Sequence, residues 1–302
     1  NNGKVYKAKA YEIPEYGRTA KGIPALNFLG IDNDEHIEAM VAFEEKPDQK
    51  EQLFFTTKLG TVKRTAVAEF QNIRQSGLIA INLNEGDELI SVKVTNGDQN
   101  IIIGTKDGYA ASFHEDDVRS MGRNATGVRG INLRDGDEVV GADILRPDSY
   151  VLVISENGYG KGTKVEEYGI RRRGGKGVKT FKITDKNGSL VGMRTYTGEE
   201  DILLITNEGI IIRFSAEDIS KTGRDTQGVR LMRLDEEHFI STMSIVYPDD
   251  EDENEEGTEA VEEQELDGEM PNLEDSDRPA EVDELIGRAE ADFDSDDDVD
   301  KE

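Results

Sequence analysis

The strongest constraint on the fold is a repeat of about 50 residues. Five segments carry a glycine followed by an apolar residue, at Gly22, Gly77, Gly127, Gly177 and Gly228. Successive copies are 55, 50, 50 and 51 residues apart. A second glycine precedes each of these by 17 to 19 residues, at Gly3, Gly60, Gly108, Gly158 and Gly209. Two glycines kept in register over five copies indicate one structural unit used repeatedly.

Within each unit the apolar runs are short, rich in β-forming residues and bounded by Gly, Asn and Asp. The last unit predicts four strands, at 202–206, 210–214, 229–234 and 239–246. Four strands in about 50 residues are typical of propeller-like blades. No window keeps a helical period, and one small sheet cannot bury both of its faces, so the units are expected to stack. The predicted fold class is therefore all-β.

The first unit lacks its leading strand, because the chain begins at the turn that contains Gly3. We expect that an upstream strand, and with it a further blade, precedes residue 1, which is Asn and not Met. A ring closed by this chain alone would leave an unpaired strand edge, which sheet proteins generally avoid.

Charge divides the chain into two regions. It holds 65 Asp and Glu against 36 Lys and Arg, for a formal net charge of −29. Residues 249–302 account for 27 of the acidic and 3 of the basic residues, which leaves 38 acidic and 33 basic residues in 1–248. The repeats are therefore close to neutral, and the charge does not exclude nucleic acid as it would in an evenly acidic chain. We predict a repeat domain at 1–247 and an acidic, disordered tail at 248–302.

The basic residues concentrate in the connection between the second and third predicted strands, at 12–22, 69–77, 117–127, 168–177 and 218–228, termed here the basic loops. Each basic loop holds an arginine before its glycine: Arg18, Arg74, Arg123, the run Arg171, Arg172 and Arg173, and Arg224. Further cations are Lys21, Arg119, Lys176 and Lys221 within the loops and Arg129, Lys179 and Arg230 just after the glycines. Equivalent positions of a repeat fall on one side of the assembly, so these residues predict a single basic stripe.

A stripe of Arg among Gly, Thr and Asn suits phosphate, because guanidinium groups bind phosphate oxygens bidentately and glycine lets the backbone approach closely. Nothing in the sequence indicates a recognition helix or zinc finger. We therefore predict binding to the backbone of double-stranded DNA, with little sequence preference and strong salt dependence. The plainer interpretation is that the loops are polar turns whose arginines are solvated.

The densest basic segment is Arg171-Arg172-Arg173-Gly174-Gly175-Lys176-Gly177. It resembles the gyrase A box, Gln-Arg-Arg-Gly-Gly-Lys-Gly, which marks the C-terminal domain of the DNA gyrase A subunit. Arg171 stands where the box has Gln, and the box of that family lies in the first blade, whereas this copy is in the fourth of five units. The stretches EIPEYGRTAKGIP, GRNATGVRGINL, ENGYGKGT and GRDTQGVRL also resemble that domain, so the resemblance spans about residues 1–247.

The resemblance implies a six-bladed β-pinwheel that wraps DNA around its basic perimeter, in a bacterial cytoplasmic enzyme that supercoils DNA negatively. It implies as partners the rest of the gyrase A subunit, together with the gyrase B subunit, in an A2B2 heterotetramer. It implies no catalytic residue and no cofactor in this domain, whereas the parent enzyme needs ATP and Mg. Two alternatives stay open: the equivalent domain of topoisomerase IV, and a protein-binding propeller scaffold.

The other motifs indicate no catalytic or metal-binding site. His36, His114 and His238 occur singly, and the chain has no cysteine for a disulfide, thiolate metal site or nucleophile. Residues 84–88 and 134–138 are acidic but fall at one repeat position and are interpreted as hairpin turns, and 294–300 lacks the glycine of a calcium loop. No long apolar run or leader indicates a membrane span or secretion. The tail is expected to compete with DNA for the basic stripe or to act in solubility.

Overall fold

The computed structural model describes residues 1–17, 20–31, 35–42, 50–74, 76–235 and 237–247. All of the described residues belong to one compact unit. The predicted tail at 248–302 lies outside the described residues, so its disorder and the domain boundary stay predictions. No helix in the described ranges is long and apolar enough to cross a membrane.

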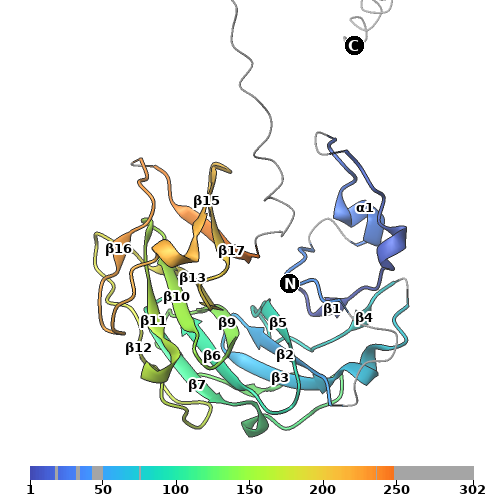
Figure 1. Ribbon diagram of the computed structural model, residues 1–302. Coiled ribbons are helices and arrows are strands. Elements are labelled where there is room, and N and C mark those ends of the chain that lie inside the picture. Colours follow the sequence, from blue (N-terminus) through green and yellow to red (C-terminus); the bar gives the residue numbers. More distant parts are fainter. Residues whose placement is uncertain (18–19, 32–34, 43–49, 75, 236, 248–302) are drawn as a thin grey trace, which may run out of the picture. The chain divides into compact units, whose positions relative to one another are not determined.

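The described chain forms small antiparallel sheets that follow one another in chain order (Figure 1). The first two have the strand orders β5 (Leu89–Thr95), β2 (Gln52–Thr57), β3 (Thr61–Ala66), β8 (Val128–Arg129), and β9 (Val139–Leu145), β6 (Asn100–Thr105), β7 (Tyr109–His114), β12 (Val178–Lys179). The next two have the orders β13 (Leu190–Tyr196), β10 (Tyr150–Ser155), β11 (Tyr159–Lys164), β16 (Val229–Arg230), and β17 (Ile240–Val246), β14 (Asp201–Thr206), β15 (Ile211–Ser215). These sheets confirm the prediction of an all-β chain of repeated units.

The first unit is the least regular. Its strand β1 (Lys4–Val5) pairs with β4 (Leu78–Ile79) of the second unit, and a short helix α1 (Ala25–Leu29) follows. Single 3-10 turns, mostly after the second strand of a unit, complete the described elements: η1 (Ala10–Glu12), η2 (Val67–Phe70), η3 (Glu115–Asp117), η4 (Val165–Glu167) and η5 (Ala216–Asp218).

The core lies between neighbouring sheets. Ile101 and Ile103 of β6 pack in the cluster that contains Phe54, whereas Ile102 packs in the cluster that contains Val153. Successive side chains of a strand point to opposite faces, so β6 contributes to two cores, one on each side of its sheet. A strand buried on both faces is a continuous apolar run and not an alternating one, as the sequence of these strands shows. The prediction that the units stack to bury both faces is thereby confirmed.

The repeated glycines occupy tight positions. Gly108 has a φ of +81° in the turn from β6 to β7, and a Cβ added there would lie 2.5 Å from the carbonyl oxygen of Phe181. Gly177 has a φ of +74°, and a Cβ there would lie 2.7 Å from the carbonyl oxygen of Ala110. Both contacts join one repeat to the next, so the register of the glycines reflects how closely neighbouring units approach.

The third strand of each unit differs from its prediction. The segment predicted as a strand at 229–234 forms only the two-residue strand β16, which pairs with β11 of the preceding unit and not with its own sheet. Strands β8 and β12 pair with β3 and β7 in the same way. The basic loop leads the chain back onto the neighbouring sheet, so each four-stranded sheet has three strands of one repeat and one of the next. We call β8, β12 and β16 the outer edge strands, because β5, β9 and β13 form the opposite edges.

The acidic segments at 84–88 and 134–138 are not hairpin turns, and that prediction is wrong. They connect β4 to β5 and β8 to β9, strands that belong to different sheets. Asp87 is buried, and its Oδ1 accepts a hydrogen bond from the N–H of Leu59 at 2.8 Å while its Oδ2 accepts one from Thr57 Oγ1 at 2.7 Å. These carboxylates therefore fix the turn between β2 and β3 and its counterparts.

Candidate nucleic-acid interface

Three predicted cations occupy one register position on the outer edge strands. Arg129 pairs with Thr61, Lys179 with Tyr109 and Arg230 with Tyr159, each at the second residue of its short strand. The side chains of all three are exposed. Neighbouring sheets contact each other through the edge strands β5, β9 and β13. The three cations lie at the opposite edge of each sheet, as the order of strands from β9 to β12 in Figure 1 illustrates. The repeat thus brings these cations to equivalent places, as the sequence predicted.

The first sheet breaks this series. In β4 the equivalent position holds Ile79, which pairs with Lys4 and is 48% exposed. Lys21 and Arg74 are exposed but belong to no strand, and Arg18 lies outside the described residues. The structure therefore aligns the cations that follow the last three basic loops and gives no such alignment after the first two.

The box-like segment 171–177 lies against the preceding repeat through its main chain. The N–H of Gly174 donates to the carbonyl of Gly130 at 2.6 Å, and the carbonyl of Gly175 accepts from the N–H of Asn132 at 2.9 Å. The N–H of Arg171 donates to the carbonyl of Ser112 at 2.9 Å. With the backbone held in this way, the side chains of Arg171, Arg172 and Lys176 are exposed.

One arginine in each of the last two basic loops binds the preceding repeat. Arg173 donates from Nε to the carbonyl of Asp117 at 2.7 Å and from Nη1 to the carbonyl of Arg129 at 3.0 Å. Arg224 occupies the next copy, and its Nη1 donates to the carbonyl of Lys179 at 3.2 Å. These two guanidinium groups are partly buried and tie each basic loop to the outer edge strand before it.

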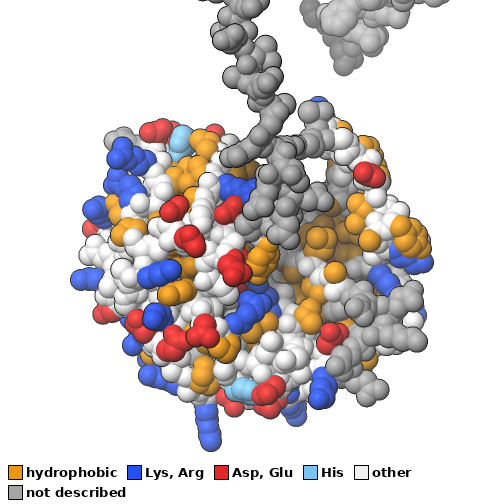
Figure 2. Space-filling view, in the orientation of Figure 1, with side chains coloured by type: hydrophobic (Ala, Val, Ile, Leu, Met, Phe, Trp, Pro, Cys, Tyr) orange, Lys and Arg blue, Asp and Glu red, His pale blue; other side chains and the backbone are white. Residues whose placement is uncertain are grey.

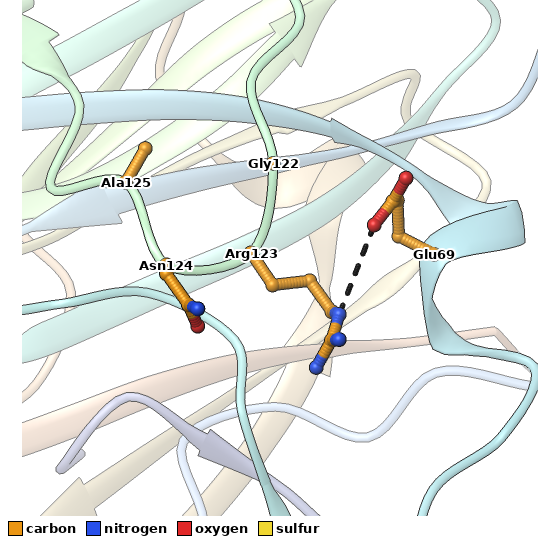
Figure 3. A pocket seen from close by; sticks show the side chains of 5 residues that line it. All are labelled: Glu69, Gly122, Arg123, Asn124 and Ala125. Atoms are coloured by element: carbon orange, nitrogen blue, oxygen red, sulfur yellow. Dashed lines mark ion pairs between the residues drawn. The ribbon is translucent and has the colours of Figure 1, made fainter.

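Arg123, the copy one repeat earlier, faces an acidic partner. Its Nε lies 3.8 Å from Oε2 of Glu69, across a shallow cavity of about 360 Å³ that is also lined by Gly122, Asn124 and Ala125 (Figure 3). The two side chains are 30% and 52% exposed, so the pair contributes at most about 1 kcal/mol.

Acidic residues accompany the cations at one repeat position. Glu69, Asp117 and Glu167 lie in the 3-10 turns η2, η3 and η4 and contact the following basic loop. Figure 2 shows Lys and Arg side chains along the margin of this face where β12 and β16 lie, with Asp and Glu among and beside them. The basic stripe is thus interspersed with fixed carboxylates, a feature that the sequence analysis did not anticipate.

Tyrosine side chains contact Arg230 and two further cations, Arg134 and Lys221. The guanidinium carbon of Arg134 lies 3.2 Å from the ring centre of Tyr109, and Nη2 of Arg230 donates to the Tyr159 hydroxyl at 2.8 Å. The hydrogen bond from Arg230 lowers the pKa of Tyr159 from its ordinary value. Lys221 lies over the ring of Tyr150, with Nζ 4.7 Å from the ring centre. The tyrosine that directly follows the turn glycine in two units was the available signal for the first two contacts.

Two buried lysines, Lys63 and Lys161, were also not predicted from the sequence. Each is 0% exposed and reaches the main chain of a basic loop. The signal was a lysine three residues after a turn glycine, at a position where the other units have an apolar residue or tyrosine.

The remaining predicted residues are exposed to solvent or make local contacts. Arg119 is exposed next to the buried Val118. His114 Nε2 lies 3.1 Å from Asp98 Oδ1, and the N–H of His238 donates to the carbonyl of Asp235 at 3.0 Å. In the described ranges no three His, Cys, Asp or Glu side chains come together as a metal site would require.

The comparisons with known proteins bear on the whole repeat domain. Residues 1–44, 51–96, 99–146, 149–196 and 200–246 match the family described as "DNA gyrase C-terminal domain, beta-propeller". The DNA gyrase A subunit of Staphylococcus aureus strain MRSA252 is 44% identical over 265 residues, which cover 87% of this chain and 30% of that protein. A second Staphylococcus aureus DNA gyrase A subunit is 43% identical over 263 residues, with 86% and 30% covered. The chain therefore spans about a third of the length of these relatives.

Solved structures show the same fold. A structure of a DNA gyrase A C-terminal domain superposes with a TM-score of 0.70 at 28% identity, covering 82% of this chain and 80% of that one. The crystal structure of a C-terminal domain of DNA topoisomerase IV superposes with a TM-score of 0.76 at 26% identity, covering 82% and 77%. Both confirm a β-pinwheel of repeated blades, whereas the number of six blades implied by the resemblance stays a prediction. The match of five successive repeats to one family model, with the identity to the gyrase proteins, shows that the chain belongs to the family of DNA gyrase C-terminal domains.

Proposed function

We propose that residues 1–247 bind double-stranded DNA through its phosphate backbone and wrap it along the outer edge strands. The observation that carries this proposal is the shared register of Arg129, Lys179 and Arg230 on three successive sheets. A row of cations at equal steps along a stack of sheets matches a continuous polyanion, because each sheet meets the next stretch of backbone with the same groups.

The chemistry of the loops supports a backbone contact. The exposed guanidinium groups of Arg171 and Arg172 and the ammonium of Lys176 are suited to phosphate oxygens. No described element is a helix long enough to enter a major groove, since the longest is the five-residue α1. Affinity is therefore expected to depend on salt more than on base sequence, and bending of DNA around the edge follows from contacts on successive sheets.

We further propose that the domain serves a bacterial, cytoplasmic gyrase composed of two A and two B chains as A2B2. In that enzyme, wrapping by this domain would present DNA for ATP- and Mg-dependent negative supercoiling. The 44% identity to a DNA gyrase A subunit supports this assignment. We assign no bond-breaking step, and no ATP or Mg contact, to the described residues.

The alternative from the same fold is the C-terminal domain of topoisomerase IV, which the TM-score of 0.76 supports. The two assignments differ in how strongly the domain is expected to wrap a plasmid. Sealing a nicked, protein-bound plasmid with ligase and separating its topoisomers distinguishes them, because a domain that wraps DNA strongly shifts the distribution and a weak wrapper leaves it unchanged.

The test of DNA binding compares two double variants with the same change in charge. Lys179→Ala/Arg230→Ala removes two edge cations, whereas Arg146→Ala/Lys164→Ala removes two exposed cations away from the outer edge strands. We expect the first variant to bind several unrelated duplexes more weakly and to lower the slope of log K against log salt by about 2. The second is expected to keep the wild-type slope within about 1.

A wild-type protein that does not shift any duplex at low salt would favour the protein-binding scaffold instead. Loss of affinity for one duplex sequence only would contradict backbone binding, because phosphate contacts carry no sequence information.

A further inference from the structure

The side chain of Lys161 is buried beneath the last basic loop. It extends from β11, is 0% exposed, and its Nζ donates to the carbonyls of Gly223 and Arg224 at 2.5 Å each. A third contact joins Nζ to Thr226 Oγ1 at 2.9 Å. The three N–H donors of an ammonium group thus meet three acceptors, all of them in the loop of the following repeat.

Lys63 repeats this arrangement two units earlier. It extends from β3, is also 0% exposed, and its Nζ donates to the carbonyls of Ala80 and Arg123 at 2.5 Å each. Arg123 and Arg224 are equivalent arginines of their basic loops. In both places the carbonyl of that arginine therefore accepts from a buried lysine of the preceding sheet.

The two sheets between and after them lack the lysine. Three residues after the turn glycine, where Lys63 and Lys161 stand, these two units have Ala111 and Ile212, and the first unit has Tyr6. The box-like segment therefore has no ammonium beneath it, and its loop is held through Ser112, whose Oγ donates to the carbonyl of Gly169 at 3.0 Å. Of the last three basic loops, the first and the third thus contact a buried ammonium and the middle one does not.

The contacts have an electrostatic consequence at the surface. A carbonyl oxygen carries partial negative charge and repels a phosphate, and a peptide group turned toward a buried ammonium directs this end away from the solvent. The ammonium is costly to bury, and an apolar residue of similar length would fill the same space without that cost. A role in packing alone therefore does not account for a lysine at these two positions.

We propose that Lys63 and Lys161 are positioning residues of the DNA-binding surface, which hold the carbonyls of the basic loops inward so that the exposed cations of these loops, such as Arg119 and Lys221, face the phosphate backbone. This inference rests on the proposed binding of DNA and adds two residues that touch no DNA themselves. It also implies that affinity depends on the proton carried by each buried amine.

Both buried amines lie near ionisable groups that shift their pKa values. Burial lowers the pKa of Lys161 to about 8, while Glu167 and Asp225 raise it and Arg224 lowers it further. Burial lowers the pKa of Lys63 to about 8 as well, with Arg123 lowering it and Glu69 raising it. A neutral amine has two N–H donors and a lone pair, so above pH 8 it no longer matches the acceptors of the loop. A bound phosphate nearby favours the charged form, so DNA binding is expected to take up protons in this range.

The first experiment compares Lys161→Met with Lys164→Met, in the full chain, by fluorescence anisotropy with one labelled duplex at fixed salt and pH 7. Both lysines lie on β11, but Lys164 is exposed and makes none of these loop contacts. We expect Lys161→Met to weaken binding roughly fivefold and Lys164→Met by less than about twofold, because loss of one distant charge has little effect in salt. Equal affinities of the two variants would overturn the proposal.

The second measurement detects the loop itself. Limited digestion with trypsin, followed by mass spectrometry, reports cleavage after Lys221, Arg224 and Arg230 well below the melting temperature of each variant. Faster cleavage after Arg224 in Lys161→Met than in Lys164→Met supports the proposal, and the same rate in both contradicts it. This readout needs no DNA, so it stays informative if the wild type binds no duplex and the proposed function itself fails.

The third measurement covers the case in which Lys161→Met does not fold. The affinity of the wild type is followed from pH 7 to pH 9.5 at constant ionic strength and compared with that of Lys161→Arg, whose guanidinium stays charged. A larger loss of affinity in the wild type is expected. Parallel profiles for the two proteins would overturn the proposal.

Discussion

Arg173 and Arg129 belong to successive repeats, and the guanidinium of the first donates from Nη1 to the carbonyl of the second at 3.0 Å. The same bond recurs one repeat later between Arg224 and the carbonyl of Lys179 at 3.2 Å. Each bond ends on the residue whose side chain is an exposed cation of an outer edge strand. The arginine of one loop therefore fixes the backbone from which the cation of the preceding strand projects.

Arg173 and Arg172 are adjacent in sequence but differ in what they contact, and this leads to opposite expectations for stability. Arg173→Ala removes two hydrogen bonds to main-chain carbonyls and should lower the free energy of unfolding by about 1–2 kcal/mol. Arg172→Ala, at an exposed side chain, should leave it within about 0.5 kcal/mol. Both variants should bind DNA more weakly. Urea denaturation and anisotropy measure the two effects, and equal stabilities would show that the Arg173 bonds contribute nothing in solution.

Two glycines of the box-like segment should respond differently to the same substitution. Gly177→Ala places a Cβ at 2.7 Å from the carbonyl oxygen of Ala110 at a φ of +74° and should destabilise the domain by roughly 1–3 kcal/mol. Gly175→Ala meets no atom within 4 Å and has no positive φ, so it should be close to neutral. Thermal denaturation followed by circular dichroism compares them. A Gly175→Ala variant as unstable as Gly177→Ala would contradict the placement of this loop.

Asp143 joins β5, β9 and β13 and predicts a pH dependence of stability. Its Oδ1 lies 2.9 Å from Lys93 Nζ, and its Oδ2 accepts from the N–H of Thr195 at 2.9 Å. Burial alone would raise the pKa of Asp143, but Lys93 and the N–H groups of Thr195 and Ile144 hold it below its ordinary value. A depressed pKa means that the carboxylate stabilises the fold above the unfolded pKa of about 3.9 and that this contribution is lost as pH falls through the folded pKa.

The variant Asp143→Asn should therefore cost about 2 kcal/mol at pH 7 and progressively less as the pH falls toward about 3. Asp185→Asn, at an exposed carboxylate, serves as the control and should be close to neutral at both values. Urea denaturation across this range measures the difference. A cost for Asp143→Asn that does not change with pH would show that packing, and not the charge, is what the substitution removes.

The acidic tail gives a prediction about DNA that concerns charge alone. Deletion of 249–302 removes a net charge of −24 from the chain, since this segment holds 27 acidic and 3 basic residues. The deletion should raise DNA affinity at low salt several-fold, with the gain shrinking as salt rises. Replacing the tail by an uncharged Gly/Ser segment of equal length keeps the tether and controls for its bulk. Unchanged affinity at low salt in both proteins would leave the tail with a role in solubility.

The sequence predicted the features that recur at the same position of successive repeats. The glycines predicted the turns, the continuous apolar runs predicted strands buried on both faces, and the common place of Arg129, Lys179 and Arg230 predicted their alignment. The pairing of the third strand was not predictable in this way, because Val229 and Arg230 have the same pattern whether they join their own sheet or the preceding one. Which sheet they join depends on the path of the loop, which brings Gly228 so close to the preceding sheet that a Cβ added there would lie 2.7 Å from the carbonyl oxygen of Gly160.

The candidate site could be predicted only in part from the sequence, for a related reason. A cation in a loop is equally polar whether it faces solvent, as Arg172 does, or binds a carbonyl, as Arg173 does, and the sequence does not separate the two. Lys161 was missed because a lysine inside a strand is ordinarily a solvated residue. Its burial is set by the loop that folds over it from the next repeat, where Arg224 is 63 residues away in sequence.

The donation of an outer strand to the preceding sheet also limits how such a domain can change in length. Removal of a segment such as 149–196, cut at the boundaries of the sequence repeat, would carry β12 away from the sheet of β7 and leave β16 without β11 to pair with. Any duplication or loss of a unit must therefore rebuild the seams on both of its sides. Neighbouring repeats are joined by a strand of one that completes the sheet of the other. We therefore expect the number of blades to vary less than the loops between neighbouring repeats.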